Sequence, residues 1–376
     1  MAPKNVFVAR QARAYDAIVV GSGITGGYAA KELCELGLET LVLERGRNVE
    51  HGTDYVTEHK PTWAFPARNS SDGKRYTDVY PVQSRTYAFG EHSEHFFIKD
   101  KENPYIEVKP FTWIRGDHVG GRSLMWGRQC YRWSEMDFEA NARDFQIGAV
   151  GELPGLEDAY YIGNRPNGIY VPRFRNVSPQ TKRSDYLRGF GYQGSASRPS
   201  WGRPMKGFGA DFKHALREPG PWEMRFSAFG ETLPRYDNLV ALDPEQTDPW
   251  GIPLLRISCE WGENEMAMRP DMAESAAEML DAAGAKNIRT FNNYNEDGLG
   301  AEPGLGIHEM GTARMGRDPK TSVLNGHNQC HDVPNVFVTD GACMASSACQ
   351  NPSITYMALT ARAAHFAVDE LKKMNL

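Results

Sequence analysis

The sequence predicts an α/β protein with two lobes, and three observations lead to this fold class. An apolar strand, a glycine-rich turn and a helical pattern follow one another near the N-terminus, as in a parallel βαβ unit. Alternating apolar runs in the middle of the chain favour an antiparallel sheet. The 376 residues allow two or more lobes and a large buried core. We therefore expect a Rossmann-like nucleotide-binding domain and a second domain that contains an antiparallel sheet.

The N-terminal unit is predicted from the stretch "YDAIVVGSGITGGYAAKELCELGLETLVLERG". A strand over residues 17–20 leads into a Gly-x-Gly-x-x-Gly turn formed by Gly21, Gly23 and Gly26. The first glycine permits a tight turn, the second lets the backbone approach a pyrophosphate, and the third lets helix and strand pack closely. Unpaired N–H groups at the helix start then hold the phosphate charge.

A second strand, "TLVLE", ends in Glu44, at the distance from the first glycine that suits an acid bound to a ribose hydroxyl. Strand, glycines, helix, second strand and terminal acid together predict dinucleotide binding. The pattern leaves NAD and FAD both open. Glu44 disfavours NADP, because its carboxylate would meet the additional phosphate.

A second glycine cluster occurs in "RGDHVGGRSLMWG", far from the first in the sequence. Gly120 and Gly121, with Ser123 beside them, let the backbone approach a flat group closely. Paired glycines also mark ordinary tight turns, so a turn between strands is the alternative. Gly120, Gly121 and Ser123 are therefore candidates for cofactor binding.

The stretch "GLGIHEMGTARMG" contains one histidine, His308, among many glycines. Its glycines disfavour a helix, each by about 1 kcal/mol relative to alanine, and so predict a loop. A zinc-binding H-E-x-x-H motif is excluded, because Thr312 stands where the second histidine is needed. His308 is then a catalytic base, a ligand to something other than zinc, or an ordinary loop histidine. No metal site is predicted elsewhere in the chain.

Two further C-terminal features follow. The run "NVFVTDGA", residues 335–342, predicts a strand whose closing Asp340-Gly341 turn can offer backbone N–H groups to a phosphate. The run "CQNPSITYMALTARAAHFAVDEL" has helical apolar spacing, with Asn351 as the expected N-cap and Pro352 as the first helical residue. A capping side chain can also point into an active site.

The middle of the chain predicts the second domain. "NLVALD" and "PLLRIS" read as strands, and "NEMAMRPDMAESAAEMLDAAGA" as a covering helix. We expect the nucleotide-binding domain over residues 1–140, with an excursion of the second domain near 60–110. The substrate domain follows over 150–302, and residues 303–376 complete the first domain.

Composition excludes several classes of protein. The formal charge of −6 and the scattered lysines and arginines argue against a nucleic-acid partner. No apolar run approaches the roughly 18 residues of a membrane span, and the first residues do not resemble an export signal. Six cysteines at irregular spacings favour free thiols over a disulfide framework.

These motifs together resemble the glucose-methanol-choline (GMC) family of flavin oxidoreductases, and most closely its bacterial glucoside 3-dehydrogenase and pyranose oxidase branch. The similarity covers the first fingerprint, "VGGRSLMWG", "HEMGTARMG", "VFVTDGA" and "QNPSITYMALTARAA". It implies FAD as cofactor, held by the glycine clusters, Glu44 and the Asp340-Gly341 turn. It also implies that His308 accepts a hydroxyl proton from the substrate while Asn351 hydrogen-bonds the same oxygen.

Two departures from the family pattern matter. Met125 stands where some pyranose oxidases carry the histidine that bonds covalently to flavin, so FAD is expected to be non-covalent. The chain is also short, and near residues 140–152 it lacks the middle segment that normally completes the FAD domain. A deletion, a natural short form and a region missing from the sequence all remain open.

The resemblance implies an FAD-dependent oxidoreductase that oxidises a secondary hydroxyl of a sugar or glycoside, such as the one at C3. An NAD-dependent dehydrogenase is one alternative, and a shortened, flavin-poor, non-catalytic partner subunit is another. The electron acceptor is open among oxygen, a quinone and a cytochrome. We expect a cytoplasmic protein, or a periplasmic one if a small partner subunit carries it across a membrane.

Overall fold

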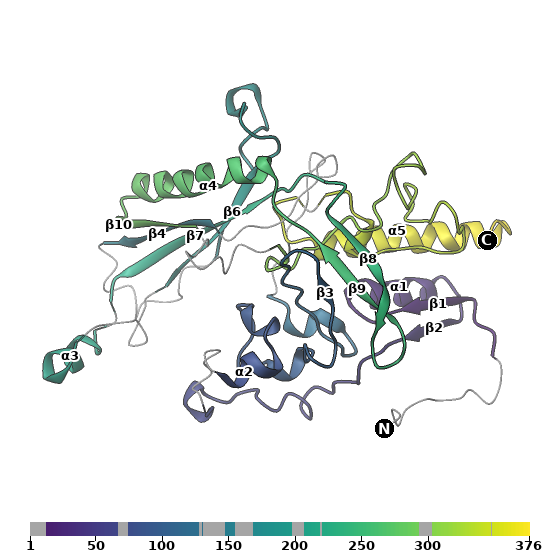
Figure 1. Ribbon diagram of the computed structural model, residues 1–376, viewed down its shortest axis with the longest axis horizontal. Coiled ribbons are helices and arrows are strands. Elements are labelled where there is room, and N and C mark those ends of the chain that lie inside the picture. Colours follow the sequence, from purple (N-terminus) through teal and green to yellow (C-terminus); the bar gives the residue numbers. More distant parts are fainter. Residues whose placement is uncertain are drawn as a thin grey trace.

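The computed structural model describes residues 13–66, 74–127, 130, 147–154, 168–197, 207–218, 220–292, 303–346 and 348–376 (Figure 1). Its α-helices are α1 (Ile24–Glu35), α2 (Lys74–Val79), α3 (Gly209–Ala215), α4 (Glu263–Ala282) and α5 (Ser353–Lys372). Its strands are β1 (Ala17–Val20), β2 (Thr40–Leu43), β3 (Ile106–Glu107), β4 (Ile147–Leu153), β5 (Ile169–Val171), β6 (Phe190–Ser197), β7 (Trp222–Gly230), β8 (Leu239–Thr247), β9 (Pro253–Ser258) and β10 (Lys286–Asn292). Short 3-10 helices occur at Thr62–Ala64, Gln83–Arg85, Glu94–Phe96, Gly121–Met125, Pro179–Thr181 and Gly341–Cys343.

The predicted N-terminal βαβ unit is confirmed. β1 and β2 pair in parallel, and α1 connects them. Val19 and Leu33 pack with Ala364 and Val368 of the C-terminal helix α5, which lies alongside α1 in Figure 1. The two ends of the chain therefore build one unit, because the apolar faces of α1 and α5 bury each other.

The second lobe is a five-stranded antiparallel sheet in the order β10-β4-β7-β6-β5, covered on one face by α4 (Figure 1). Helix α4 buries Met268, Met272, Ala276 and Leu280 completely, at the period that places side chains on one helix face. They pack in one core with apolar residues of the sheet, such as Phe226. This confirms an antiparallel sheet with a covering helix, but "NLVALD" and "PLLRIS", the two strands predicted for it, are not part of this sheet.

The two apolar runs "NLVALD" and "PLLRIS" form the antiparallel hairpin β8–β9, and β3 adds to it in parallel. The hairpin is not part of the five-stranded sheet. It lies near β1 and α1 in Figure 1, and residues of β1, β8 and β9 line the same cavity. The hairpin therefore faces the nucleotide-binding unit.

The predicted strand over residues 335–342 is wrong. Among the described residues this segment forms only an isolated bridge between Phe337 and Gln329, and its end is the 3-10 helix Gly341–Cys343. A strand needs a neighbour for its backbone hydrogen bonds, and the side of this segment toward β1 faces a cavity instead. The same cavity leaves Ile18 and Val20 of β1 61% and 82% exposed.

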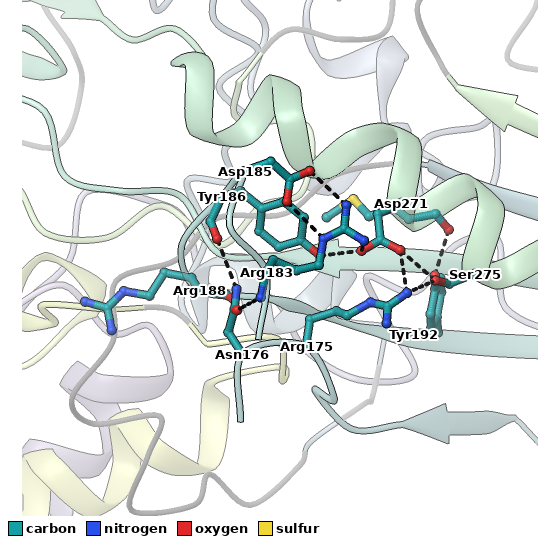
Figure 2. Close-up of polar contacts among 10 residues, drawn as sticks. Arg175, Asn176, Arg183, Asp185, Tyr186, Arg188, Tyr192, Asp271 and Ser275 are labelled. Carbon is teal, nitrogen blue, oxygen red and sulfur yellow. Dashed lines mark hydrogen bonds and ion pairs between the residues drawn. The ribbon is translucent and has the colours of Figure 1, made fainter. Parts of the chain in front are cut away.

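One polar network fixes α4 to the loop that leads into β6 (Figure 2). Asp271 of α4 accepts hydrogen bonds from Arg175 at 2.7 Å, from the Tyr186 hydroxyl at 2.5 Å and from Ser275 at 2.9 Å, and Arg183 lies 3.5 Å away. Burial acts to raise the pKa of Asp271, but these partners hold it below its ordinary value. The carboxylate therefore stays ionised and joins segments far apart in the sequence.

Several sequence predictions concern residues outside the described ones. The missing segment was expected near residues 140–152. Residues 131–146 and 155–167 are not described, so the first part of this region lies outside the description, and β4 begins at Ile147. The three domain ranges stay predictions.

All six cysteines are free, as predicted from their irregular spacing. Within the described part of the chain, no helix is both long enough and apolar enough to cross a membrane.

Candidate active site

The two glycine clusters, which are far apart in the sequence, lie against each other. A Cβ atom on Gly121 would lie 3.3 Å from the Cα atom of Gly23, and the backbone N–H of Gly120 donates to the Ser22 hydroxyl at 3.0 Å. Gly120 and Gly121 both have positive φ angles, of 96° and 54°, which residues with side chains rarely adopt. The clusters thus form one backbone cradle at the start of α1.

The third fingerprint glycine has the predicted packing role. A Cβ atom on Gly26 would lie 1.9 Å from the backbone oxygen of Gly21, so only glycine lets α1 cross β1 this closely. The helix begins after Gly23, which is its N-cap and has no side chain to occupy the N–H groups of the first turn. Those N–H groups suit a phosphate.

Glu44 is held at the same cradle. Its carboxylate accepts hydrogen bonds from the Ser22 N–H at 2.8 Å, from the Ser22 hydroxyl at 2.5 Å and from the Gly46 N–H at 2.8 Å. Burial acts to raise the pKa of Glu44, but these donors hold it below its ordinary value.

A cavity of about 1790 Å³ opens beside this cradle. The cofactor candidates among its lining residues are Gly21, Gly23, Gly26, Ser123, Asp340 and Gly341. Glu44, Gly120 and Gly121 are not in the lining, although the last two support it through Gly23. The volume exceeds the about 300–1,000 Å³ of ordinary small-molecule sites, and the lining includes Gly21 and Gly23 at the start of α1, where backbone N–H groups suit a phosphate. The residues present therefore fit a dinucleotide such as FAD.

The predicted Asp340-Gly341 turn also lines the cavity, and it packs against the loop of His308. Asp340 caps the 3-10 helix by accepting from the Ala342 N–H at 3.0 Å. A Cβ atom on Gly341 would lie 2.6 Å from the backbone oxygen of Glu309 and 2.9 Å from the Tyr356 hydroxyl. Burial raises the pKa of Tyr356 well above its ordinary value, so this hydroxyl stays protonated.

An ion pair connects the same loop to the second glycine cluster. Arg122 donates to the Glu309 carboxylate at 2.8 Å, and both residues line the cavity. The second carboxylate oxygen of Glu309 is buried without a hydrogen-bond partner in the described structure. Because Glu309 follows His308 directly, this pair restrains the loop that carries the candidate base.

His308 and Asn351, which are 43 positions apart, meet beside strand β6. The Asn351 Nδ2 atom lies 3.4 Å from the His308 Nε2 atom. On its other side, the Asn351 Oδ1 atom accepts a short hydrogen bond from Gln193 of β6. Glu309, the residue after His308, lines the cavity, whereas His308 and Asn351 are not among its lining residues.

The prediction that Asn351 is the N-cap of the last helix is wrong by one residue. The N-cap is Pro352, and α5 begins at Ser353. The Asn351 side chain makes no cap because its amide is engaged by Gln193 and His308. That its side chain points into an active site stays a prediction.

Sequence reasoning did not find Gln193, Ser22 or the Arg122–Glu309 pair. Ser22 lies inside the glycine fingerprint, and Glu309 is next to His308 in the sequence. These positions could have indicated that both residues lie near the candidate site. Gln193 gave no signal, because a single glutamine in a strand indicates no particular chemistry. Only the folding of β6 toward the Asn351 segment reveals it.

Comparisons with known proteins show which family this chain is similar to. Residues 234–360 match the C-terminal domain model of the GMC oxidoreductases. The chain is 39% identical over 138 residues to 2-methyl-1,2-propanediol dehydrogenase of Mycolicibacterium austroafricanum, which is 37% of this chain and 24% of that protein. It is 30% identical over 266 residues to the gluconate 2-dehydrogenase flavoprotein of Pantoea cypripedii, which is 67% of this chain and 39% of that protein.

Among solved structures, the fold is similar to that of pyridoxine 4-oxidase from Mesorbium loti. The TM-score is 0.50 at 13% identity, and the similarity covers 94% of this chain and 99% of the other. The predicted resemblance to the GMC oxidoreductases, an enzyme family, is therefore confirmed, together with the mixed α/β fold class. The chain spans only a quarter to two fifths of the curated relatives described above.

Proposed function

We propose that this protein is an FAD-dependent oxidoreductase that oxidises a secondary hydroxyl of a sugar or glycoside, such as the one at C3. The observation that carries the proposal is the approach of Asn351 Nδ2 to His308 Nε2 at 3.4 Å, where the next residue, Glu309, lines a cavity with a phosphate-binding cradle. The two curated relatives are named for gluconate and a propanediol, which are both hydroxylated compounds. This supports an alcohol group as the reacting part of the substrate.

The proposal assigns the cofactor to the cradle and the cavity. The residues that would hold FAD, without a covalent bond, are Gly21, Gly23, Gly26, Glu44, Gly120, Gly121, Ser123, Asp340 and Gly341. Residues 1–140 and 303–376 then form the FAD-binding domain, and residues 150–302 the substrate domain. When bound, the flavin would supply a hydride acceptor.

The chain's own residues would handle the proton and the oxygen of the substrate. His308 Nε2 takes the hydroxyl proton, because an alcohol is a poor hydride donor until that proton is removed and imidazole titrates near neutral pH. The Asn351 amide N–H donates to the same oxygen as its negative charge develops. Loss of the carbon-bound hydrogen as hydride then leaves a carbonyl group.

The test is a visible absorption spectrum of the purified chain before and after glucose or a glucoside is added without oxygen. Flavin bands that bleach on addition of the sugar are the expected result. NADH binding without any flavin would support the NAD-dependent alternative instead. A colourless sample that stays colourless after incubation with FAD would favour the non-catalytic partner subunit.

His308→Ala separates cofactor binding from catalysis. We expect this variant to keep its flavin bands but to bleach about 10²–10⁴ times more slowly, the usual contribution of a general base. The matched control is His214→Ala, on the exposed helix α3, which should bleach like the wild type. Equal rates in the wild type and His308→Ala would contradict the assignment.

A further inference from the structure

Gln193 points toward the candidate site because of its register in the sheet. Its neighbour Tyr192 is completely buried on the α4 side, where its hydroxyl donates to the Met272 backbone oxygen at 2.7 Å. Successive strand residues point to opposite faces of a sheet, so Gln193 points away from α4. Gly191 lies on the same face, and a Cβ atom there would lie 3.4 Å from Cys349, two residues before Asn351.

The hydrogen bond from Gln193 determines which end of the Asn351 amide faces His308. An amide side chain accepts only at its oxygen and donates only at its nitrogen. Gln193 Nε2 donates to Asn351 Oδ1, so the nitrogen is the end left for His308 Nε2. A ring nitrogen that receives an N–H donor is the one without a proton.

We propose that Gln193 is a positioning residue that fixes the Asn351 amide and thereby keeps His308 in the tautomer protonated at Nδ1. This inference rests on the proposed function, because that function gives an unprotonated Nε2 its role as base. Gln193 acts through Asn351 and does not itself exchange a proton with the substrate. The N–H group of Gln193, rather than the shape of its side chain, orients the Asn351 amide.

The isosteric substitution Gln193→Glu reverses the order of donors. An ionised carboxylate only accepts, so Asn351 turns its Nδ2 toward position 193 and its Oδ1 toward His308. His308 must then donate from Nε2, and the tautomer changes. Asn351→Asp acts from the other side and has the same consequence, because its carboxylate accepts from both Gln193 and His308.

The experiment is NMR spectroscopy of the full-length chain labelled with ¹⁵N-histidine, in which the resonance missing from His308→Ala identifies His308. We expect the Nδ1–H tautomer in the wild type, a change to Nε2–H or to imidazolium in Gln193→Glu and Asn351→Asp, and a mixture in Gln193→Leu. The matched control is Gln246→Glu on the exposed face of β8, which should leave the His308 resonances unchanged. Circular dichroism and urea unfolding check that each variant folds.

An Nε2–H tautomer in the wild type would overturn the proposal, as would an unchanged tautomer in folded Gln193→Glu and Asn351→Asp. Anaerobic sugar reduction by the flavin-loaded chain provides a second measurement. There Gln193→Glu should lower the rate constant of bleaching about tenfold or more, and raising the pH should not restore it. If the tautomer changes as expected but the wild type oxidises no sugar, the proposed function fails while the positioning role stands.

Discussion

Asp271 joins helix α4 to the loop before β6 through one buried carboxylate. Its partners come from the loop before β6 and from α4 itself, and Figure 2 shows them converging on its two oxygens. Its side chain is 7% exposed, so water could not replace these hydrogen bonds if a partner were removed. Asp271 thereby ties α4 to the loop that leads into β6, the strand of Gln193.

Asp271→Asn should lower the free energy of unfolding at pH 7 by about 1–3 kcal/mol, the value of hydrogen bonds to a charged group. The folded-state pKa lies below the ordinary value of 3.8, so ionised Asp271 stabilises the fold above that pH. This contribution is lost as the pH falls through the lower, folded-state pKa. Urea unfolding at several pH values measures it.

The difference between the wild type and Asp271→Asn should therefore narrow as the pH falls below about 4. The control is Asp211→Asn on α3, where the aspartate is exposed and the change should be within about 0.5 kcal/mol. A difference that stays constant with pH would mean that the network acts through shape and not through charge.

The crossing of β1 and α1 is fixed by one glycine and not by its neighbour. The backbone oxygen of Gly21 occupies the place where a Cβ atom of Gly26 would lie, at 1.9 Å. Gly27, one position later in the same helix, is exposed, and its Cβ atom would meet only the Ser22 backbone oxygen at 3.6 Å. The fingerprint therefore requires glycine at position 26 but not at position 27.

Gly26→Ala should destabilise the chain by about 3 kcal/mol, because two backbone segments must separate to admit the methyl group. Gly27→Ala should instead stabilise it by about 0.5–1 kcal/mol, since alanine in a helix loses less conformational entropy. Thermal unfolding of both variants gives the comparison. Equal effects of the two substitutions would show that α1 does not cross β1 as closely as described.

At the scale of the whole molecule, both ends of the chain and the β8–β9 hairpin surround one large cavity. Apolar side chains face it from several elements, and Ile18, Val20, Leu239 and Val240 are all between 40% and 82% exposed. Soluble proteins rarely leave contiguous apolar surface of this kind uncovered. The lining of the cavity thus combines the glycines at the start of α1 with exposed apolar side chains.

The folded chain should increase the fluorescence of the dye ANS, which binds exposed apolar surface. Val20→Lys should weaken this increase, because Val20 lines the cavity and is 82% exposed. Trp63→Lys is the control, since Trp63 is 80% exposed but not in the lining. Added FAD should reduce the dye signal of the wild type, and no effect of Val20→Lys would contradict dye binding in the cavity.

Much of the fold could be predicted from local patterns. The strand at Ala17–Val20, the helix after Gly23, the β8–β9 hairpin and the amphipathic helix α4 follow from periodicity and turn chemistry, which nearby residues determine. The strand expected over 335–342 did not form, because a strand also needs a partner, and local sequence does not say whether one is present. Helix α5 begins one residue later than predicted, because the Asn351 side chain contacts Gln193 and His308 and does not cap the helix.

The sequence by itself determined the N-terminal βαβ unit and the residue types of the candidate site, since glycine spacing and the flanking apolar runs act over a few residues. Only the tertiary structure decided that His308 and Asn351 meet, that the two glycine clusters form one cradle, and that Gln193 contacts Asn351. Each of these contacts joins segments dozens of residues or more apart. Their approach depends on how the sheets and helices pack, and no local pattern encodes it.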